Sequence, residues 1–142
     1  MNEPRPPVTL ELDWQGELRF SGRSDGVQMI LDGDRTAGPS PVQALAFALA
    51  GCMAIDVVHV LTKGRLGLEG LRARLTAERA PEEPRRLVKV DLRFLVTGDV
   101  PPDRVERAIA LSREKHCSVW HSLRQDMEFT TSYEIRKAEV AR

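Results

Sequence analysis

Two cysteines are the residues of this chain whose chemistry most needs an explanation. Cys52 lies in the most apolar stretch, ALAFALAGCMAIDVV at 44–58, and Cys117 lies far downstream in HCSVWHSL at 116–123. Free cysteine is often an inert core residue. The alternatives are a metal ligand, a hydrolase nucleophile beside a histidine, or a pair of thiols that cycles through a disulfide.

The surroundings of the two cysteines predict different reactivities. Cys52 falls in the middle of an apolar predicted helix, where loss of solvent opposes thiolate formation. Cys117 follows Lys115 and His116 at the start of a short predicted helix, where backbone N–H groups lower a thiol pKa. The sequence therefore predicts that Cys117 ionises more easily and that Cys52 needs an outside group to activate it.

A metal site would need residues that are scattered along the chain. Cys52, His59 and Cys117 would have to combine with His116 or His121. These residues form no CxxC or HxxxH pair that would assemble half of a site in advance. We therefore expect no metal and no other bound cofactor.

Charge and the N-terminus limit the class of protein. The chain has 142 residues, with 21 Lys and Arg against 21 Asp and Glu. This balance gives no electrostatic reason for binding nucleic acid or a membrane. Residues 1–12 lack the apolar core of a signal peptide, so we expect a cytoplasmic protein without a structural disulfide framework.

Apolar and polar residues alternate in the first part of the chain as they do in strands. The apolar residues that share one face of a predicted half-buried strand are Val8, Leu10, Leu12 and Trp14. Three such segments separated by turns predict an antiparallel meander, with strands at 8–14, 18–22 and 27–32. Residues 1–7, which contain three prolines, are predicted to be a loose N-terminal arm.

A long helix is predicted over residues 41–63. Ser40 is suited to cap it, Pro41 fits its first turn, and Gly64 ends it. The apolar run at 44–55 is too short to cross a bilayer of about 30 Å, so we interpret it as part of a core helix. Because this run is apolar nearly all round, the rest of the protein or a second subunit must enclose it.

The second half of the chain completes an α+β domain. Two long alternating segments separated by APEEPR predict a wide hairpin, helical spacing follows, and a last strand closes the chain. The predicted elements are strands at 68–79, 87–98 and 128–136 and helices at 101–115 and 117–123. The whole order is βββαββααβ with a long central helix, and we expect one domain over residues 1–142.

Two segments of the sequence resemble one known family. They are SPVQALAFALAGCMAIDVVHVL at 40–61 and LSREKHCSV at 111–119, and each contains one cysteine. In order and spacing they are similar to the OsmC/Ohr family of organic-hydroperoxide and osmotic-stress proteins, most of all to its OsmC-like branch. The resemblance covers roughly Val27 to Ile135 and agrees with the predicted order of elements.

The resemblance implies a tightly intertwined homodimer, with the long helices at its centre and the sites at the subunit interface. It also implies a thiol peroxidase for organic hydroperoxides, in which Cys52 attacks the peroxide and becomes a sulfenic acid. Cys117 then resolves this acid to a disulfide, and an external dithiol reductant restores both thiols. A pocket near Cys52 would favour organic peroxides, and the apolar side chains considered for it are Leu49, Met53, Phe47 and Trp120.

The chain departs from the family at the groups that activate the first cysteine. The family has a Glu ten positions before that cysteine, paired with an Arg; here Val42 stands at that position, next to Gln43. Arg19 and Arg23 are the candidates for the arginine. Without such a pair a buried thiol keeps a high pKa.

Asp56 and His59, one and two helical turns after Cys52, are candidate replacements for that pair. A histidine near Cys52 would act as a base or as a stabilising cation. The alternative interpretation is a polar stripe that faces solvent or a partner. The sequence leaves three functional hypotheses. The first is a peroxidase that uses both cysteines. The second is a protein of the same fold that binds a small apolar or thiol-reactive ligand at the dimer interface without turnover, and the third is a protein whose thiols are structural.

Overall fold

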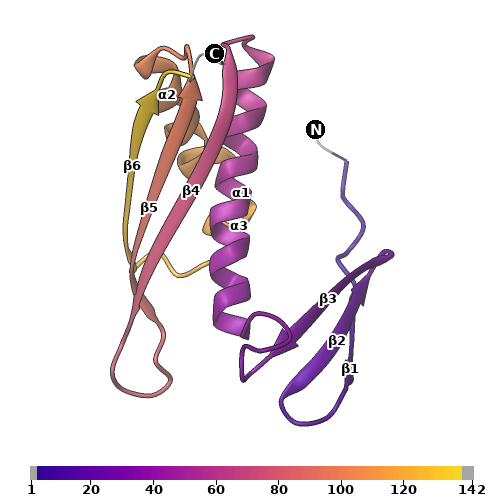
Figure 1. The fold of residues 1–142 in the computed structure, drawn as a ribbon. Helices are drawn as coiled ribbons and strands as arrows, with labels where there is room; N and C mark the ends of the chain where they lie inside the picture. The colour runs from indigo at the N-terminus through magenta and orange to yellow at the C-terminus, as the bar shows by residue number, and fades with distance from the viewer. Residues whose placement is uncertain (1–2, 139–142) are drawn as a thin grey trace. The chain divides into compact units, whose positions relative to one another are not determined.

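The computed structural model describes residues 3–138, which form two compact units that divide between Leu45 and Ala46. One long helix, α1 (Pro41–Lys63), begins in the N-terminal unit and continues into the C-terminal unit (Figure 1). The single domain expected over residues 1–142 stays a prediction. Residues 3–7 of the predicted arm contain no helix or strand, and residues 1–2 lie outside the described part.

The N-terminal unit is a three-stranded antiparallel sheet, as the alternation predicts. Its strands are β1 (Glu11–Trp14), β2 (Arg19–Ser24) and β3 (Val27–Asp32), in the order β1-β2-β3. The prediction of a half-buried face on the first strand is wrong, because all four of its apolar residues are exposed: Val8, Leu10, Leu12 and Trp14. A single layer of three short strands does not bury a face by itself, since burial needs a second packed layer.

The loop between β3 and α1 is held by one buried carboxylate, that of Asp32. Its side chain is 1% exposed, and it accepts hydrogen bonds from the N–H groups of Asp34 and Ala37 at 2.9 Å and from the Thr36 hydroxyl at 2.8 Å. These donors, led by the Ala37 N–H, hold the pKa of Asp32 far below its ordinary value. The loop therefore has a fixed conformation where it enters α1.

A capping box starts α1, in agreement with the predicted start. The Ser40 hydroxyl accepts the N–H of Gln43 at 3.2 Å, and the Gln43 amide oxygen accepts the N–H of Ser40 at 3.0 Å. The helix ends at Lys63, as predicted, and is about 35 Å long at 1.5 Å per residue. It is long and apolar enough to cross a membrane by length and composition alone, a test that a buried core helix also passes.

One stripe of α1 contributes to the core of the C-terminal unit. Its members, spaced by four residues and at most 1% exposed, are Leu49, Met53, Val57 and Leu61. Other apolar side chains of the helix face outward, since Phe47 is 69% and Ile55 70% exposed. The single chain thus covers one side of a helix that is apolar nearly all round.

The C-terminal unit contains the second three-stranded sheet, ordered β4-β5-β6. β4 (Leu68–Arg79) and β5 (Leu87–Gly98) form the predicted antiparallel hairpin, and β6 (Glu128–Arg136) lies parallel to β5 (Figure 1). The fully buried residues of the central strand are Val90, Leu92, Phe94 and Val96, which share one cluster with the stripe of α1. The sheet and α1 are therefore two layers with one core between them.

A π-turn separates the two helices that precede β6. α2 (Pro102–Leu111) ends at Leu111 rather than at the predicted residue 115, and η1 (Ser112–His116) is a π-helical turn. The Cys117 N–H closes this turn by donating to the Ser112 carbonyl oxygen at 2.8 Å. The short α3 (Ser118–His121) follows, so the predicted order of strands and helices is otherwise confirmed.

We predict that Asp32→Asn destabilises the protein at neutral pH, because an amide oxygen is a weaker acceptor than a carboxylate for the donors of the loop. The pKa of Asp32 is lower in the folded than in the unfolded chain. The carboxylate therefore stabilises the fold fully above about pH 5, and this contribution is lost progressively as the pH falls below the unfolded value near 3.8. Thermal melts from pH 7 downwards should show a difference between native protein and variant that shrinks in acid.

Asp34→Asn, an exposed change in the same loop, is the matched control and should melt like the native protein at every pH. Equal melting temperatures for the native protein and Asp32→Asn at pH 7 would contradict the role assigned to Asp32.

Candidate thiol site

Cys52 and Cys117 meet inside the C-terminal unit. Cys52 is half-buried on α1 and packs against the core cluster that contains the fully buried Cys117. The Cys52 thiol lies near enough to Cys117 to contribute to the raised pKa of the Cys117 thiol. Both cysteines are free thiols. The fold thus makes neighbours of two thiols that lie far apart in the sequence, which a reversible disulfide requires.

The Cys117 sulfur occupies a buried position in which it ionises poorly. It accepts the Trp120 N–H at 3.3 Å as the cap of α3, and this bond favours the thiolate. Burial outweighs it and, together with the nearby Cys52 thiol and Asp56 carboxylate, raises the pKa of Cys117 to about 11. The prediction of a lowered pKa for Cys117 is therefore wrong, because loss of solvent costs more than one backbone donor offsets.

Asp56, one of the candidate supporting residues, contacts the π-turn. Its carboxylate accepts a hydrogen bond from the Ser112 hydroxyl at 2.7 Å, which joins α1 to η1. Asp56 is half-buried, and Ser112 is fully buried. Because the Ser112 carbonyl oxygen also accepts the Cys117 N–H, one serine links the helix of Cys52 to the turn that carries Cys117.

Ser112 is missed by the sequence motifs, although the sequence contains a signal for it. Val105, Ala108 and Ile109 form the buried face of α2, and Ser112 continues the same helical spacing. A hydroxyl on an apolar helix face must find a hydrogen-bond partner inside the protein. Asp56, the one acidic residue within the apolar α1, is that partner.

Aromatic packing fixes α3, the short helix that Cys117 caps. The ring centres of Trp120 and Phe129 lie 4.4 Å apart, and the Arg113 guanidinium lies 4.7 Å from the Phe129 ring centre. Arg113 also donates to the Phe129 carbonyl oxygen at 2.7 Å, and its own carbonyl oxygen lies 2.9 Å from His121 Nε2. These contacts hold the Trp120 N–H against the Cys117 sulfur.

His59 lies in a hollow that begins at Asp56 and follows α1 toward its end. The hollow has a volume of about 520 Å³, and its lining residues are Asp56, His59, Val60, Lys63, Gly64 and His116. His59 comes two turns after Cys52, about 10 Å along the helix axis, which is beyond the reach of a direct hydrogen bond. The structure therefore does not support direct activation of Cys52 by His59. Within residues 3–138, no three His, Cys, Asp or Glu side chains are grouped to hold a metal ion.

Two more of the supporting candidates have structural partners in the N-terminal unit. Arg19 Nε lies 3.7 Å from the carboxylate of the buried Asp32, and the Arg19 guanidinium reaches Glu17 at 4.0 Å. Gln43 is a member of the capping box that starts α1. Both side chains thus stabilise the unit to which they belong.

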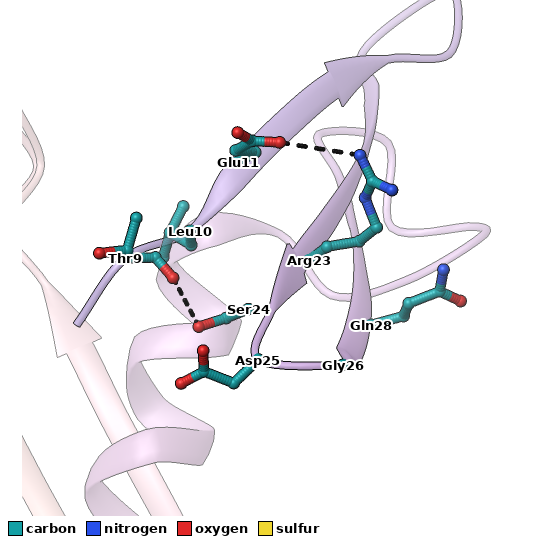
Figure 2. Close-up of a pocket in the computed structure, with 8 residues that line it drawn as sticks. All are labelled: Thr9, Leu10, Glu11, Arg23, Ser24, Asp25, Gly26 and Gln28. Atoms are coloured by element: carbon teal, nitrogen blue, oxygen red, sulfur yellow. Dashed lines mark hydrogen bonds and ion pairs between the residues drawn. The ribbon is translucent and has the colours of Figure 1, made fainter.

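Arg23, the last candidate, is an exposed residue of β2. Its guanidinium lies 3.5 Å from the Asp13 carboxylate and 3.7 Å from that of Glu11. Beside it the Ser24 hydroxyl donates to the Thr9 carbonyl oxygen at 2.7 Å, and together they line a hollow of about 590 Å³ (Figure 2). Neither cysteine lines this hollow, so its size does not make it the site of thiol chemistry.

Most of the apolar side chains expected to line a pocket near Cys52 are core residues. Leu49 is 1% and Met53 0% exposed, and Trp120 is 6% exposed. Phe47, in contrast, is largely exposed. Leu49, Met53 and Trp120 are thus used in packing the C-terminal unit, and the pocket expected near Cys52 stays a prediction.

Comparison with known proteins identifies relatives along most of the chain. A family described as OsmC-like protein matches residues 32–132. Protein YhfA of Escherichia coli K12 is 42% identical over 125 residues, which cover 86% of this chain and 93% of YhfA. A hypothetical protein of Aquifex aeolicus VF5 has a similar structure, with a TM-score of 0.87 and 23% identity over 95% of this chain and 100% of its own. An organic hydroperoxide resistance protein OsmC of Legionella pneumophila has a TM-score of 0.68 and 18% identity over 92% and 98% of the two chains.

We predict that iodoacetamide labels Cys117 far more slowly than Cys52 in the reduced protein at pH 7.5. With a pKa of about 11, only about 3 in 10,000 Cys117 thiols are ionised at that pH, and the sulfur is fully buried. Mass spectrometry of the labelled peptides measures both rates, and labelling of Cys117 should keep rising with pH up to about 11. In urea, where burial is lost, the two cysteines should react alike. Equal rates in the folded protein would show that Cys117 is neither buried nor protonated.

Proposed function

Because this chain belongs to the OsmC-like protein family, we propose that it is a thiol-dependent peroxidase that reduces organic hydroperoxides. The observation that carries the proposal is that Cys52, which is half-buried, packs against the core cluster that contains the fully buried Cys117. Two neighbouring thiols can take up the two oxidising equivalents of one peroxide as a single disulfide.

Cys52 is the nucleophile of the proposed cycle. Its thiolate attacks the distal oxygen of the peroxide, the O–O bond breaks, and the alkoxide takes up a proton and leaves as an alcohol. The sulfenic acid on Cys52 then reacts with the Cys117 thiol, which closes the disulfide and releases water. An external dithiol reduces the disulfide and restores both thiols, so the cycle needs no bound cofactor.

The raised pKa of Cys117 keeps this thiol out of the first step of the cycle. A protonated thiol does not compete for the peroxide, and its proton leaves with the sulfenic hydroxyl group as water. Burial also keeps Cys117 away from oxidants in solution. The difference in burial between the two cysteines therefore supports Cys52 as the first thiol to react and Cys117 as the second.

A cytoplasmic homodimer completes the proposal. The large apolar side chains exposed on α1 are Leu45, Phe47, Ile55 and Val58. Exposed apolar surface of this kind favours association, and a second copy of the chain offers the same helix face in return. In such a dimer the outer side of α1 is enclosed, as a helix that is apolar nearly all round requires.

One observation favours the alternative function, a protein of this fold that binds a small apolar or thiol-reactive ligand at the dimer interface without turnover. Val42 stands where the family has its glutamate, and Arg19 and Arg23 are paired with carboxylates of their own unit. A Cys52 without an activating cation attacks peroxide slowly, yet it can still trap a thiol-reactive ligand. The rate of the reaction with peroxide decides between the two functions.

We predict that cumene hydroperoxide converts the reduced protein to a Cys52–Cys117 disulfide within seconds and that hydrogen peroxide does so more slowly. Mass spectrometry of acid-quenched samples measures both rates. Cys52→Ser should abolish the reaction, whereas Cys117→Ser should retain it and stop at an oxidised Cys52. Circular dichroism of both variants shows whether the fold survives. Thiols that stay reduced through minutes of excess oxidant would contradict the peroxidase and leave ligand binding as the better function.

A further inference from the structure

Asp56 occupies an unusual position for a carboxylate. It is the one acidic residue between Pro41 and Lys63, and it comes one turn after Cys52 on nearly the same side of the helix. It is also half-buried, and a carboxylate withdrawn from water is costly unless a donor compensates it. The donor here is the Ser112 hydroxyl at 2.7 Å.

The Ser112 hydroxyl is likewise withdrawn from water. Ser112 is 0% exposed at the end of the apolar face of α2, so its hydroxyl also requires a partner inside the protein. The hydrogen bond to Asp56 joins two segments that are far apart in the sequence. Since removal of either group leaves the other without this partner, the bond couples α1 to η1 more strongly than a bond between exposed groups does.

The same serine reaches Cys117 through the main chain. The Ser112 carbonyl oxygen accepts the Cys117 N–H at 2.8 Å and so closes the π-turn. Cys117 then leaves the turn in an extended conformation, with φ −75° and ψ 97°, and its sulfur caps α3. Ser112 is thus tied to α1 by its side chain and to Cys117 by its carbonyl group.

We propose that Asp56 is a positioning residue, which holds Cys117 beside Cys52 through Ser112 so that the two thiols close readily into a disulfide. Asp56 acts through Ser112 and not on a substrate. The inference rests on the proposed function for its purpose, because disulfide closure is the second step of that cycle. The geometry itself is present whether or not the protein reduces peroxides.

The charge of Asp56 has a second effect, which is on the ionisation of Cys117. A carboxylate near Cys117 disfavours the thiolate and contributes, after burial and the Cys52 thiol, to the raised pKa of Cys117. The Cys117 thiol is therefore protonated at neutral pH in the reduced protein. Removal of the charge should lower the pH at which Cys117 becomes reactive, whether or not the hydrogen bond is kept.

The test is the redox equilibrium of the protein with glutathione, which needs no peroxide. Oxidised glutathione takes two electrons from Cys52 and Cys117, the protein disulfide forms, the glutathione disulfide breaks, and two glutathione thiols are released. Asp56→Ala and Ser112→Ala should each lower the equilibrium constant for the protein disulfide by up to about tenfold, the upper limit set by the free energy of a hydrogen bond to a charged group. The variant with both changes should be no worse than either alone, because the two residues share one bond.

Two further variants make the test specific. Asp56→Asn keeps an oxygen that accepts the Ser112 hydroxyl, so its equilibrium constant should stay close to native while the pH profile of Cys117 alkylation shifts downward. Ser122→Ala is the matched control, because it removes a hydroxyl that donates to the Ser118 carbonyl oxygen at 2.7 Å near α3 without touching Asp56. Ser112→Ala deletes one oxygen atom only, so it carries the test if Asp56→Ala does not fold.

The positioning role would be overturned if Ser112→Ala kept the native equilibrium constant. It would also be overturned if Asp56→Asn lowered that constant as much as Asp56→Ala does and left the pH profile of Cys117 alkylation unchanged. Failure of the proposed function looks different, because the native protein would then ignore cumene hydroperoxide and yet still form the disulfide in oxidised glutathione. If the protein is a peroxidase, Ser112→Ala should form the Cys52 sulfenic acid at the native rate and close the disulfide about tenfold more slowly.

Discussion

The rotation of α1 about its own axis is the constraint on which the site depends. Burial of Leu49, Met53 and Val57 in the cluster shared with β5 fixes that rotation. Each of these side chains contributes roughly 1.5–3 kcal/mol to the free energy of folding when it is fully buried. A rotation of the helix that exposed them would therefore lose several such contributions. Cys52 and Asp56 each precede a member of this stripe by one residue, or about 100°. They are therefore placed at the rim of the core, half-buried, and not in solvent.

The second half of the site depends on the π-turn. Because α2 packs its apolar face against the same core, Ser112 is buried at the end of that face, where its hydroxyl donates a hydrogen bond to Asp56. The extra residue of the π-turn changes the direction of the chain, and Cys117 leaves it extended and buried beside α1. Packing of α3 through Trp120 then holds the backbone donor against the sulfur. Cys52 is thus a thiol that is partly accessible to solvent, and Cys117 is one that is not.

Local patterns were enough to predict most elements of the fold. The bounds of 41–63, 68–79, 87–98 and 128–136 follow from alternation and capping, which depend on residues close in the sequence. The π-turn at 112–116 does not follow from them, because Ser112 has its side-chain partner on a helix far upstream, which no local pattern contains. For the same reason the helix predicted over 101–115 is too long.

The site was predictable only in part. The pairing of Cys52 with Cys117 comes from the resemblance to a family, since nothing local connects the two segments. The lowered pKa expected for Cys117 followed from its helix-start position, and the structure reverses it because burial dominates. Arg19 and Arg23 were plausible cations by type alone, but the carboxylates that pair with them are set by the register of the N-terminal sheet.

The most direct test of a two-thiol peroxidase is the stoichiometry of a single turnover without reductant. The reduced protein is mixed with excess cumene hydroperoxide, the alcohol product is quantified by chromatography, and the remaining thiols are titrated in denaturant. The cycle predicts that one alcohol is formed per chain at the rate at which two thiols disappear. Thiols that disappear without formation of alcohol, or alcohol formed with loss of only one thiol per chain, would contradict it.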